Sequence, residues 1–210
     1  MDAALRILLV RHGETALTAE HRFQGSSDEG LNTRGQQQAA ALANRLADEP
    51  LAAIYSSALT RARQTASAIA EAHALLVITD ERLGEMCFGN WEGHTYAELR
   101  QRYPLGLRYW EHNQLKVAPP GGETLRGFAN RVGGALYDLR RAHETGSIVV
   151  CAHGGVLKLI LCRALGLPPT AYWQFTIQPA SVTELSFYNE GGVLTSLNDT
   201  QHLREAVWAN

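Results

Sequence analysis

Two short apolar runs in this chain are each followed, within two residues, by a His-Gly pair. The first, 7–10, leads into Arg11-His12-Gly13, and the second, 147–152, leads into His153-Gly154-Gly155. Runs of this length bounded by glycine are typical of buried strands, and the helical pattern after each of them favours a parallel sheet. Because ligands bind beyond the carboxyl ends of such strands, we expect both histidines to lie in one site.

Strand-like and helix-like segments alternate along the rest of the chain. Apolar periodicity predicts strands at 5–10, 52–55, 75–78, 147–152, 181–188 and 193–197, and helices at 33–47, 96–103, 105–112, 155–165 and from 125 to a point before Gly146. Ser56-Ser57 is expected to cap a further helix with an inward stripe from Leu59 to Ile69, and 190–192 to form a hairpin turn. The order predicts a single domain over 1–210, a three-layer α/β/α fold with a mostly parallel central sheet.

Composition limits the classes of function. The hydrophobic fraction of 45% is enough for a sizeable core, while the formal net charge of -2 argues against nucleic acid as a partner. Cys87, Cys151 and Cys162 form no CxxC pair, so neither a disulfide framework nor a zinc site is expected. No signal peptide and no run long enough to cross a bilayer is recognised, so we expect a cytoplasmic protein without a membrane partner.

The strand-end residues suit phosphoryl transfer. Such a reaction without a metal needs a nucleophile, positive charge on the phosphoryl oxygens and an acid for the leaving oxygen. We expect His12 to be the nucleophile, Arg11 and Arg61 to grip the non-bridging oxygens, and His153, if protonated, to stabilise the transition state. Arg61 reaches the site if its preceding strand is parallel to the first, and Gly154 is expected to let the backbone approach closely.

Glu85 is the best candidate for the acid. It lies in a loop-like stretch near Phe88 and Trp91, where a carboxyl group can stay protonated near neutrality and afterwards act as base for water. Glu14 is the competing carboxylate. Its position two residues after His12 suits the orientation of a neighbouring donor better than protonation of a leaving group.

Several separate motifs carry a family resemblance over nearly the whole chain. They are Arg11-His12-Gly13-Glu14-Thr15, Arg22-Phe23-Gln24-Gly25, Leu31-Asn32 to Gly35 with Gln38-Ala39, Ser56-Ser57-Ala58-Leu59 to Arg61 and Thr65, Glu85 ahead of Phe88-Gly89-Asn90-Trp91-Glu92-Gly93, Gly121-Gly122-Glu123-Thr124, and His153-Gly154-Gly155. On these motifs the chain resembles the histidine phosphatase superfamily, in the branch named for cofactor-dependent phosphoglycerate mutase. Their order and spacing argue against a chance match.

The resemblance implies a phosphoglycerate mutase-like fold, a small phosphomonoester as partner, and no metal or other cofactor. The site residues it implies are His12 as phosphohistidine nucleophile, Glu85 as proton donor, Arg11, Arg61 and His153 as the remaining phosphate pocket, and Gln24 with Gly25 as part of the substrate edge. The family usually has Trp-Asn where this chain has Leu17-Thr18. We expect Thr18 to donate a hydrogen bond in place of the asparagine.

Met86-Cys87 favours a phosphatase over a mutase. Similar mutases carry an arginine and an aromatic pair after the acid, plus basic residues for the substrate carboxylate, whereas an apolar Met-Cys edge offers a carboxylate nothing. The 88–93 segment resembles the phosphatase branch of the family. The 153–155 and 197–202 segments resemble bacterial alpha-ribazole phosphatases and broad-specificity or phosphoserine phosphatases. The predicted function is therefore hydrolysis of a small phosphorylated metabolite, such as alpha-ribazole 5'-phosphate, phosphoserine or a sugar phosphate, with a cofactor-dependent phosphoglycerate mutase as the alternative.

Two readings from other classes stay open. A metallohydrolase could use His12, Glu14 and His153 as ligands, although the neighbouring arginines make a cation costly there. A phospho-ligand sensor without catalysis could keep the fold, although it would be free to lose Glu85.

The pocket mouth and the oligomeric state are less determined by the sequence. Residues 86–122 are expected to cover the mouth, with Arg108, Tyr109, Trp110 and His112 as candidate lining residues. The apolar hairpin and the Trp173-Gln174-Phe175 segment are equally compatible with core packing and with a homodimer interface.

Overall fold

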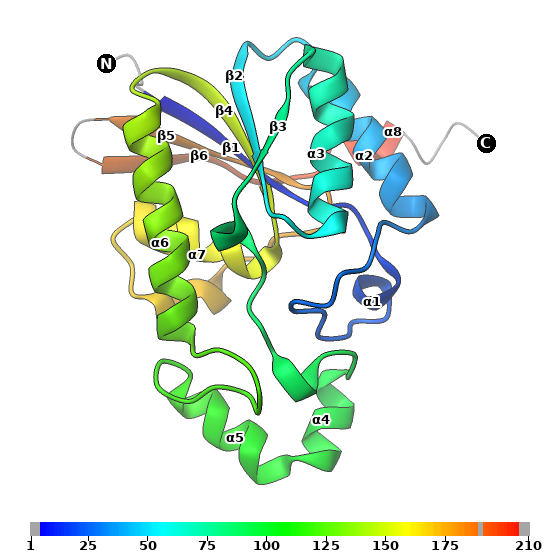
Figure 1. Ribbon diagram of the computed structural model, residues 1–210, viewed down its shortest axis with the longest axis vertical. Coiled ribbons are helices and arrows are strands. Elements are labelled where there is room, and N and C mark those ends of the chain that lie inside the picture. Colours follow the sequence, from blue (N-terminus) through cyan, green and yellow to red (C-terminus); the bar gives the residue numbers. More distant parts are fainter. Residues whose placement is uncertain (1–4, 189–190, 206–210) are drawn as a thin grey trace.

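The computed structural model describes residues 5–188 and 191–205. These form a six-stranded sheet in the order β3-β2-β4-β1-β5-β6, whose strands are β1 (Leu5–Arg11), β2 (Leu51–Ser56), β3 (Val77–Thr79), β4 (Gly146–Ala152), β5 (Val182–Tyr188) and β6 (Gly191–Asp199). The helices are α1 (Ala16–Ala19), α2 (Thr33–Leu46), α3 (Thr60–His73), α4 (Tyr96–Arg102), α5 (Pro104–Asn113), α6 (Leu125–Ala142), α7 (Gly154–Ala164) and α8 (His202–Glu205), with short 3-10 turns η1 (Glu81–Leu83), η2 (Gly89–Trp91) and η3 (Pro169–Gln174). Figure 1 shows their arrangement.

The predicted mostly parallel sheet with a terminal antiparallel hairpin is confirmed. β1, β2, β3 and β4 run parallel, while β5 is antiparallel to β1 and to β6. The hairpin turn that we placed at 190–192 includes residue 190, which is outside the described residues. In the register of the two central strands Arg11 lies opposite Ala152, so His12 and His153 leave the sheet at the same level.

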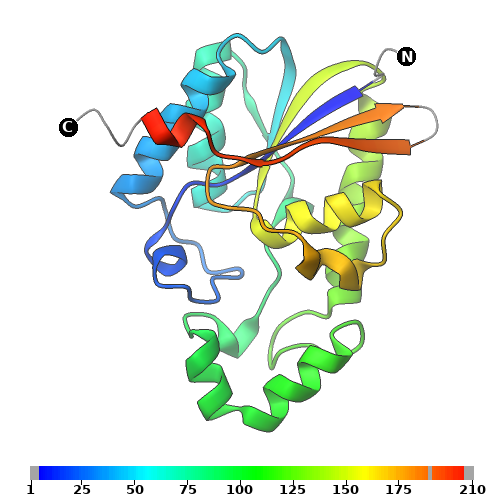
Figure 2. The same cartoon turned by 180° about the vertical axis from the view of Figure 1, so that it is seen from behind.

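Alternate residues of the central strands face two separate cores. Ile7, Leu9 and Val150 pack with apolar residues of α6 and α7. Leu8 and Val149 pack on the other side with apolar residues of α2 and α3. Helices therefore cover both faces of the sheet, with α6 and α7 on one side and α2 and α3 on the other (Figures 1 and 2). Because both faces of these strands are buried, their sequences are apolar at consecutive positions rather than at every second one.

The start of α3 differs from the prediction. Ser56 ends β2 and Leu59 is the N-cap, which forms no side-chain capping bond. Instead, the Asp28 carboxylate accepts hydrogen bonds from the Thr60 backbone N–H at 2.6 Å and the Thr60 hydroxyl at 2.9 Å. The predicted cap by Ser56-Ser57 is wrong because a carboxylate from another loop serves the helix end. At the helix end the Ser57 hydroxyl accepts only from the N–H of the N-cap residue Leu59, at 3.2 Å, and it also reaches the site.

Helices α4 and α5 lie beyond the carboxyl ends of the parallel strands, apart from the sheet (Figures 1 and 2). Aromatic packing anchors α5: Trp110 packs edge-on to Trp91 with ring centroids 5.3 Å apart and to Phe88 at 6.4 Å. No helix in the described residues is long and apolar enough to cross a membrane.

Candidate active site

His12 is the first residue beyond β1 and is buried at 2% exposure. Its Nδ1 lies 2.7 Å from the Gly13 carbonyl oxygen, which only accepts, so Nδ1 carries the ring proton. Burial, together with the charges of Arg11 and Arg61, holds the pKa of His12 well below its usual range. The ring is therefore neutral at physiological pH, with an unprotonated Nε2 that can act as a nucleophile.

His153 follows β4, and its ring centroid lies 5.1 Å from that of His12. The Arg61 Nε–H donates to His153 Nδ1 at 3.2 Å, so the His153 proton lies on Nε2, 2.8 Å from the Ser57 hydroxyl. Burial and the charge of Arg61 lower the pKa of His153 well below its usual range. A protonated His153, one of our expectations, is thus disfavoured, and the neutral ring directs its one N–H at the Ser57 hydroxyl.

Arg61 is fully buried and is held by backbone carbonyls rather than by a carboxylate. Its two terminal nitrogens donate to the carbonyl oxygens of Ser27 at 2.6 Å and Gly25 at 2.8 Å. Burial lowers the pKa of Arg61 to about 10, so the guanidinium remains charged near neutrality. A cation that has no ion-pair partner within the described ranges, beside two neutral histidines, provides a positive potential for an anion.

The loop that holds Arg61 depends on Glu92. The Glu92 carboxylate accepts hydrogen bonds from the backbone N–H and the hydroxyl of both Ser26 and Ser27, at 2.7 to 3.0 Å. Gly25 has a positive φ of 54°, and a Cβ there would lie 2.2 Å from a Glu92 oxygen. Glycine is thus required where this loop meets Glu92.

Arg11, the last residue of β1, donates from Nη1 to the Ile177 carbonyl oxygen at 2.5 Å. Its Nε is buried and has no hydrogen-bond partner among the described residues. Burial lowers the pKa of Arg11, and the nearby Glu85 carboxylate partly offsets that effect. Arg11 therefore presents a buried, incompletely satisfied guanidinium, the kind of group that a phosphoryl oxygen satisfies.

Glu85 is oriented by backbone donors on both of its oxygens. Oε1 accepts from the Met86 N–H at 2.9 Å and Oε2 from the Gly155 N–H at 3.0 Å. A Cβ on Gly155 would lie only 2.4 Å from Oε1, whereas a Cβ on Gly154 would meet Arg11 at an ordinary 3.6 Å. The close approach that we assigned to Gly154 is therefore made at Gly155, and it brings the carboxylate to the N-terminus of α7.

Arg131 of α6 fixes the backbone on either side of Glu85. Its guanidinium donates to the carbonyl oxygens of Arg82, Gly84 and Glu85 at 2.6 to 2.9 Å and pairs with the Glu123 carboxylate at 2.6 Å. Glu123 in turn accepts from the Cys87 N–H at 2.9 Å. The role of Arg131 could not be predicted from the sequence, because an arginine on an amphipathic helix is usually a solvent-exposed charge.

Three other predicted site residues, Thr18, Gln24 and Gly25, form their hydrogen bonds with neighbouring loop residues. The Thr18 hydroxyl closes a capping box with Thr15: it accepts from the Thr15 N–H at 2.8 Å and donates to the Thr15 carbonyl at 3.0 Å. Gln24 is buried, with its amide near the Thr15 hydroxyl and Glu29. Together with the Gly25 carbonyl on Arg61, these contacts suit support of the site more than direct contact with a substrate.

A pocket of about 710 Å³ opens beside Arg11. Its walls come from the segment after β1, from α4 and α5, and from η3. It is lined by Arg11, Thr18, His21, Arg22, Phe23, Tyr96, Trp110, Glu111, Gln114 and Trp173. Of the four residues that we expected from 86–122, Trp110 lines the pocket, while Arg108, Tyr109 and His112 are exposed and do not.

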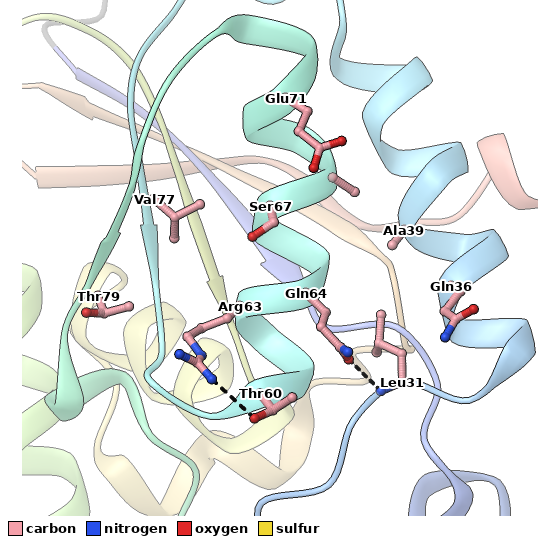
Figure 3. Close-up of a pocket in the computed structure, with 11 residues that line it drawn as sticks. Leu31, Gln36, Ala39, Thr60, Arg63, Gln64, Ser67, Glu71, Val77 and Thr79 are labelled. Carbon is pink, nitrogen blue, oxygen red and sulfur yellow. Dashed lines mark hydrogen bonds between the residues drawn. The ribbon is translucent and has the colours of Figure 1, made fainter.

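A second groove, of about 810 Å³, lies between α2, α3 and β3 (Figure 3). It is open, and two hydrogen bonds lie along its wall: Gln64 accepts from the Leu31 N–H at 2.8 Å, and Arg63 donates to the Thr60 hydroxyl at 3.4 Å. None of the predicted site residues lines this groove.

The structure also separates Glu14 from the two histidines. Its carboxylate accepts from the Asn32 amide at 3.0 Å and lies 3.8 Å from Arg34, at the start of α2. Among the described residues, no group of three or more His, Cys, Asp or Glu side chains is arranged to hold a metal ion. The ligand set His12, Glu14 and His153 is therefore not assembled.

A family model described as the histidine phosphatase superfamily, branch 1, matches residues 7–200. The chain belongs to this superfamily. The resemblance inferred from the motifs is thereby confirmed.

Relatives of this histidine phosphatase carry several names. It is 37% identical over 201 residues to phosphoserine phosphatase 1 of Hydrogenobacter thermophilus, covering 96% of this chain and 95% of that protein. It is 31% identical over 204 residues to the probable phosphoglycerate mutase GpmB of Escherichia coli O1:K1 / APEC, covering 95% of each. The crystal structure of the alpha-ribazole phosphatase from Shigella flexneri is similar at a TM-score of 0.85 and 28% identity, covering 92% of this chain and 96% of that one. These similarities confirm the prediction of a phosphatase and leave the substrate open.

Proposed function

We propose that this histidine phosphatase hydrolyses a small phosphomonoester through a phosphohistidine on His12 and without a metal ion. The observation that carries the proposal is the buried pair of neutral rings, His12 and His153, at the ends of adjacent strands with centroids 5.1 Å apart. The His12 Nδ1 proton is held by Gly13, so Nε2 is the nitrogen that can attack. Arg11 and Arg61 supply the positive charge that a phosphoryl group requires.

In the first step, the His12 Nε2 lone pair attacks phosphorus, the bond from phosphorus to the leaving oxygen breaks, and Glu85 gives its proton to that oxygen. The two arginines bind non-bridging oxygens, on which charge is concentrated, and the His153 Nε2–H exchanges the Ser57 hydroxyl for a further non-bridging oxygen. The two backbone N–H bonds to Glu85 hold its carboxyl group in place for the proton transfer.

In the second step, water attacks the phosphohistidine. Glu85, now a carboxylate, takes one proton from the water, the bond from phosphorus to Nε2 breaks, and inorganic phosphate leaves. His12 returns to its neutral form and Glu85 to its protonated form, so the cycle is balanced.

The candidate substrates are alpha-ribazole 5'-phosphate, phosphoserine and sugar phosphates. The names of the relatives support the first two, and the name of GpmB supports phosphoglycerate mutase as the alternative. Glu85 is followed by Met86 and Cys87, and Cys87 contacts Ser26 and Gly121 rather than presenting a charge. This edge favours hydrolysis over transfer back to a bound carboxylic acid.

The test is release of inorganic phosphate from a panel of phosphomonoesters in the presence of a chelator, with 3-phosphoglycerate also examined for conversion to 2-phosphoglycerate. Phosphate release without isomerisation is expected and would establish a metal-independent phosphatase. Isomerisation without phosphate release would show a mutase, and activity abolished by the chelator would show a metallohydrolase. Tight phosphate-ligand binding with no turnover would show a sensor.

A further inference from the structure

Gln114, at the C-terminal end of α5, lines the pocket, and its amide orientation is set by side chains of η3. Its Oε1 accepts hydrogen bonds from the Trp173 indole N–H at 3.1 Å and from the Tyr172 hydroxyl at 3.3 Å. An indole N–H can only donate, so the amide oxygen must be the end that faces Trp173. The Nε2 group is therefore the free end, and it has no hydrogen-bond partner among the described residues.

Gln114 is rigid as well as oriented. Its residue exposure is 9%, and its backbone carbonyl accepts from the Leu125 N–H at 2.9 Å, which ties the end of α5 to the start of α6. The acceptor end of this amide is fixed inside the protein, whereas its donor end is open to the pocket that Gln114 lines. In this pocket the acceptor has to come from the ligand or from water.

The charged groups around Gln114 favour a negatively charged acceptor. Arg11 lines the same pocket, and the Lys158 ammonium lies 5.6 Å from the Trp173 ring centroid. Lys158 forms no ion pair within the described part of the chain, and burial together with the charge of Arg11 lowers its pKa. The carboxylate of Glu111, also on the pocket wall, already accepts from the Tyr96 hydroxyl at 2.5 Å.

We propose that Gln114 is a specificity-determining residue, whose Nε2 donates to a carboxylate oxygen on the leaving group of the substrate. The Lys158 charge supports this carboxylate while Arg11 binds the phosphoryl group, so the preferred substrate class is the phosphate esters of hydroxy acids. This inference rests on the proposed hydrolysis at His12. The expectation that the Met86-Cys87 edge offers a carboxylate nothing is unaffected, since the proposed donors lie on α5 and α7.

The test compares two matched substrates, 3-phosphoglycerate and glycerol 3-phosphate. The first has a carboxylate where the second has a hydroxymethyl group. Phenyl phosphate, which has neither of these groups, is the reference. Gln114→Glu keeps an oxygen for Trp173 and Tyr172 but replaces the donor with a second carboxylate oxygen. The expected result is a loss of at least about tenfold in the ratio of kcat/KM for 3-phosphoglycerate to that for glycerol 3-phosphate, because a donor is lost and a like charge is added. Gln114→Met should lower the same ratio without a change in charge.

Gln37→Glu on the exposed side of α2 makes the same charge change away from the pocket and should leave the ratio unchanged. Lys158→Gln should lower the ratio, whereas Lys116→Gln, at the other lysine of the chain, should not. The proposal is overturned if the wild-type protein shows no preference for 3-phosphoglycerate, or if the Gln114 variants lower turnover of all three substrates equally. Failure of the wild-type protein to hydrolyse even phenyl phosphate would instead overturn the proposed function.

Discussion

His12 and His153 lie side by side, and their hydrogen bonds determine which nitrogen of each ring is free. The sequence located both residues, because a histidine directly after a buried strand is visible as a pattern. It did not reveal the protonation states, which depend on burial and on Arg61, a residue far away in the chain. The role of Ser57 as the partner of His153 was hidden for the same reason, since Ser57 reads locally as a helix cap.

At the residue scale, Glu85→Gln tests the general acid. The amide is similar in shape but cannot give up a proton, so hydrolysis of an alkyl phosphate should fall by about 10²–10⁴-fold. Hydrolysis of p-nitrophenyl phosphate should fall far less in the first step, because its leaving group needs little protonation. Burst kinetics with both substrates separate the two steps, and an equal loss in the first step for both would refute this role of Glu85.

At the element scale, the N-terminus of α7 is where the strand-end histidine and the acid meet. Gly155 permits this, because a Cβ there would overlap the end of the Glu85 side chain. The atoms that come closest belong to the flexible Glu85 side chain, while the buried Phe128 ring, 3.0 Å from such a Cβ, has to shift by a few tenths of an ångström, so the helix itself can form with alanine at this position. We therefore expect Gly155 to matter for activity more than for stability.

Gly155→Ala should lower kcat by about tenfold or more, since a displacement of an angstrom in a catalytic group has effects of this size. Gly154→Ala is the matched control and should keep most of the activity, because its Cβ would lie 3.6 Å from Arg11. Thermal unfolding of both variants checks that the fold is retained. Equal kcat values for the two variants would contradict the placement of Glu85 against Gly155.

Long periodic elements were predictable, while short ones were not. The prediction of a helix at 33–47 agrees with α2 at Thr33–Leu46, because its apolar stripe faces a core. The strand expected at 75–78 is instead β3 at Val77–Thr79, since pairing with β2 determines its register and Leu75 lies before it. Helix α1 has four residues and no buried side chain, so no periodicity announced it.

At the scale of the whole molecule, the two site histidines are buried without charge, and this makes the stability of the fold depend on pH. The folded-state pKa values of His12 and His153 lie well below 6.5, the ordinary value for histidine. Below that pH the unfolded chain binds protons that the folded protein does not. Half-buried His202, whose pKa burial also lowers, acts in the same direction.

The free energy of unfolding should therefore be nearly constant between about pH 7 and 8 and fall as the pH drops below 6.5, by up to about 1.4 kcal/mol per pH unit for each fully buried histidine. Carboxylates with lowered pKa, such as Glu92 and Asp80, act only below about pH 4.5. Urea unfolding at pH 7.5 and pH 5.5 measures the slope, and His153→Gln should reduce it. An identical slope in the variant would contradict a neutral buried His153.

The pocket wall is the part of the site that the sequence described least. The 86–122 segment was correctly expected at the pocket mouth, but only Trp110 of the four named candidates lines it. Gln114 and Glu111 were missed because the orientation of α5 is fixed by aromatic packing on Trp91, a contact between distant segments. Helical spacing alone does not say which face such packing turns toward the pocket.

The central claim is that the phosphoryl group is transferred to His12 before water releases it as inorganic phosphate. Its most direct measurement is to mix Glu85→Gln protein, in which hydrolysis of the intermediate is slowed, with p-nitrophenyl phosphate, to quench in alkali, and to locate the added phosphoryl group by mass spectrometry. The account predicts one acid-labile phosphoryl group on His12, absent from His12→Ala and unaffected in the exposed control His112→Ala. A phosphoryl group on another residue would contradict it. Turnover by the His12→Ala variant as fast as by the wild-type protein would also contradict it.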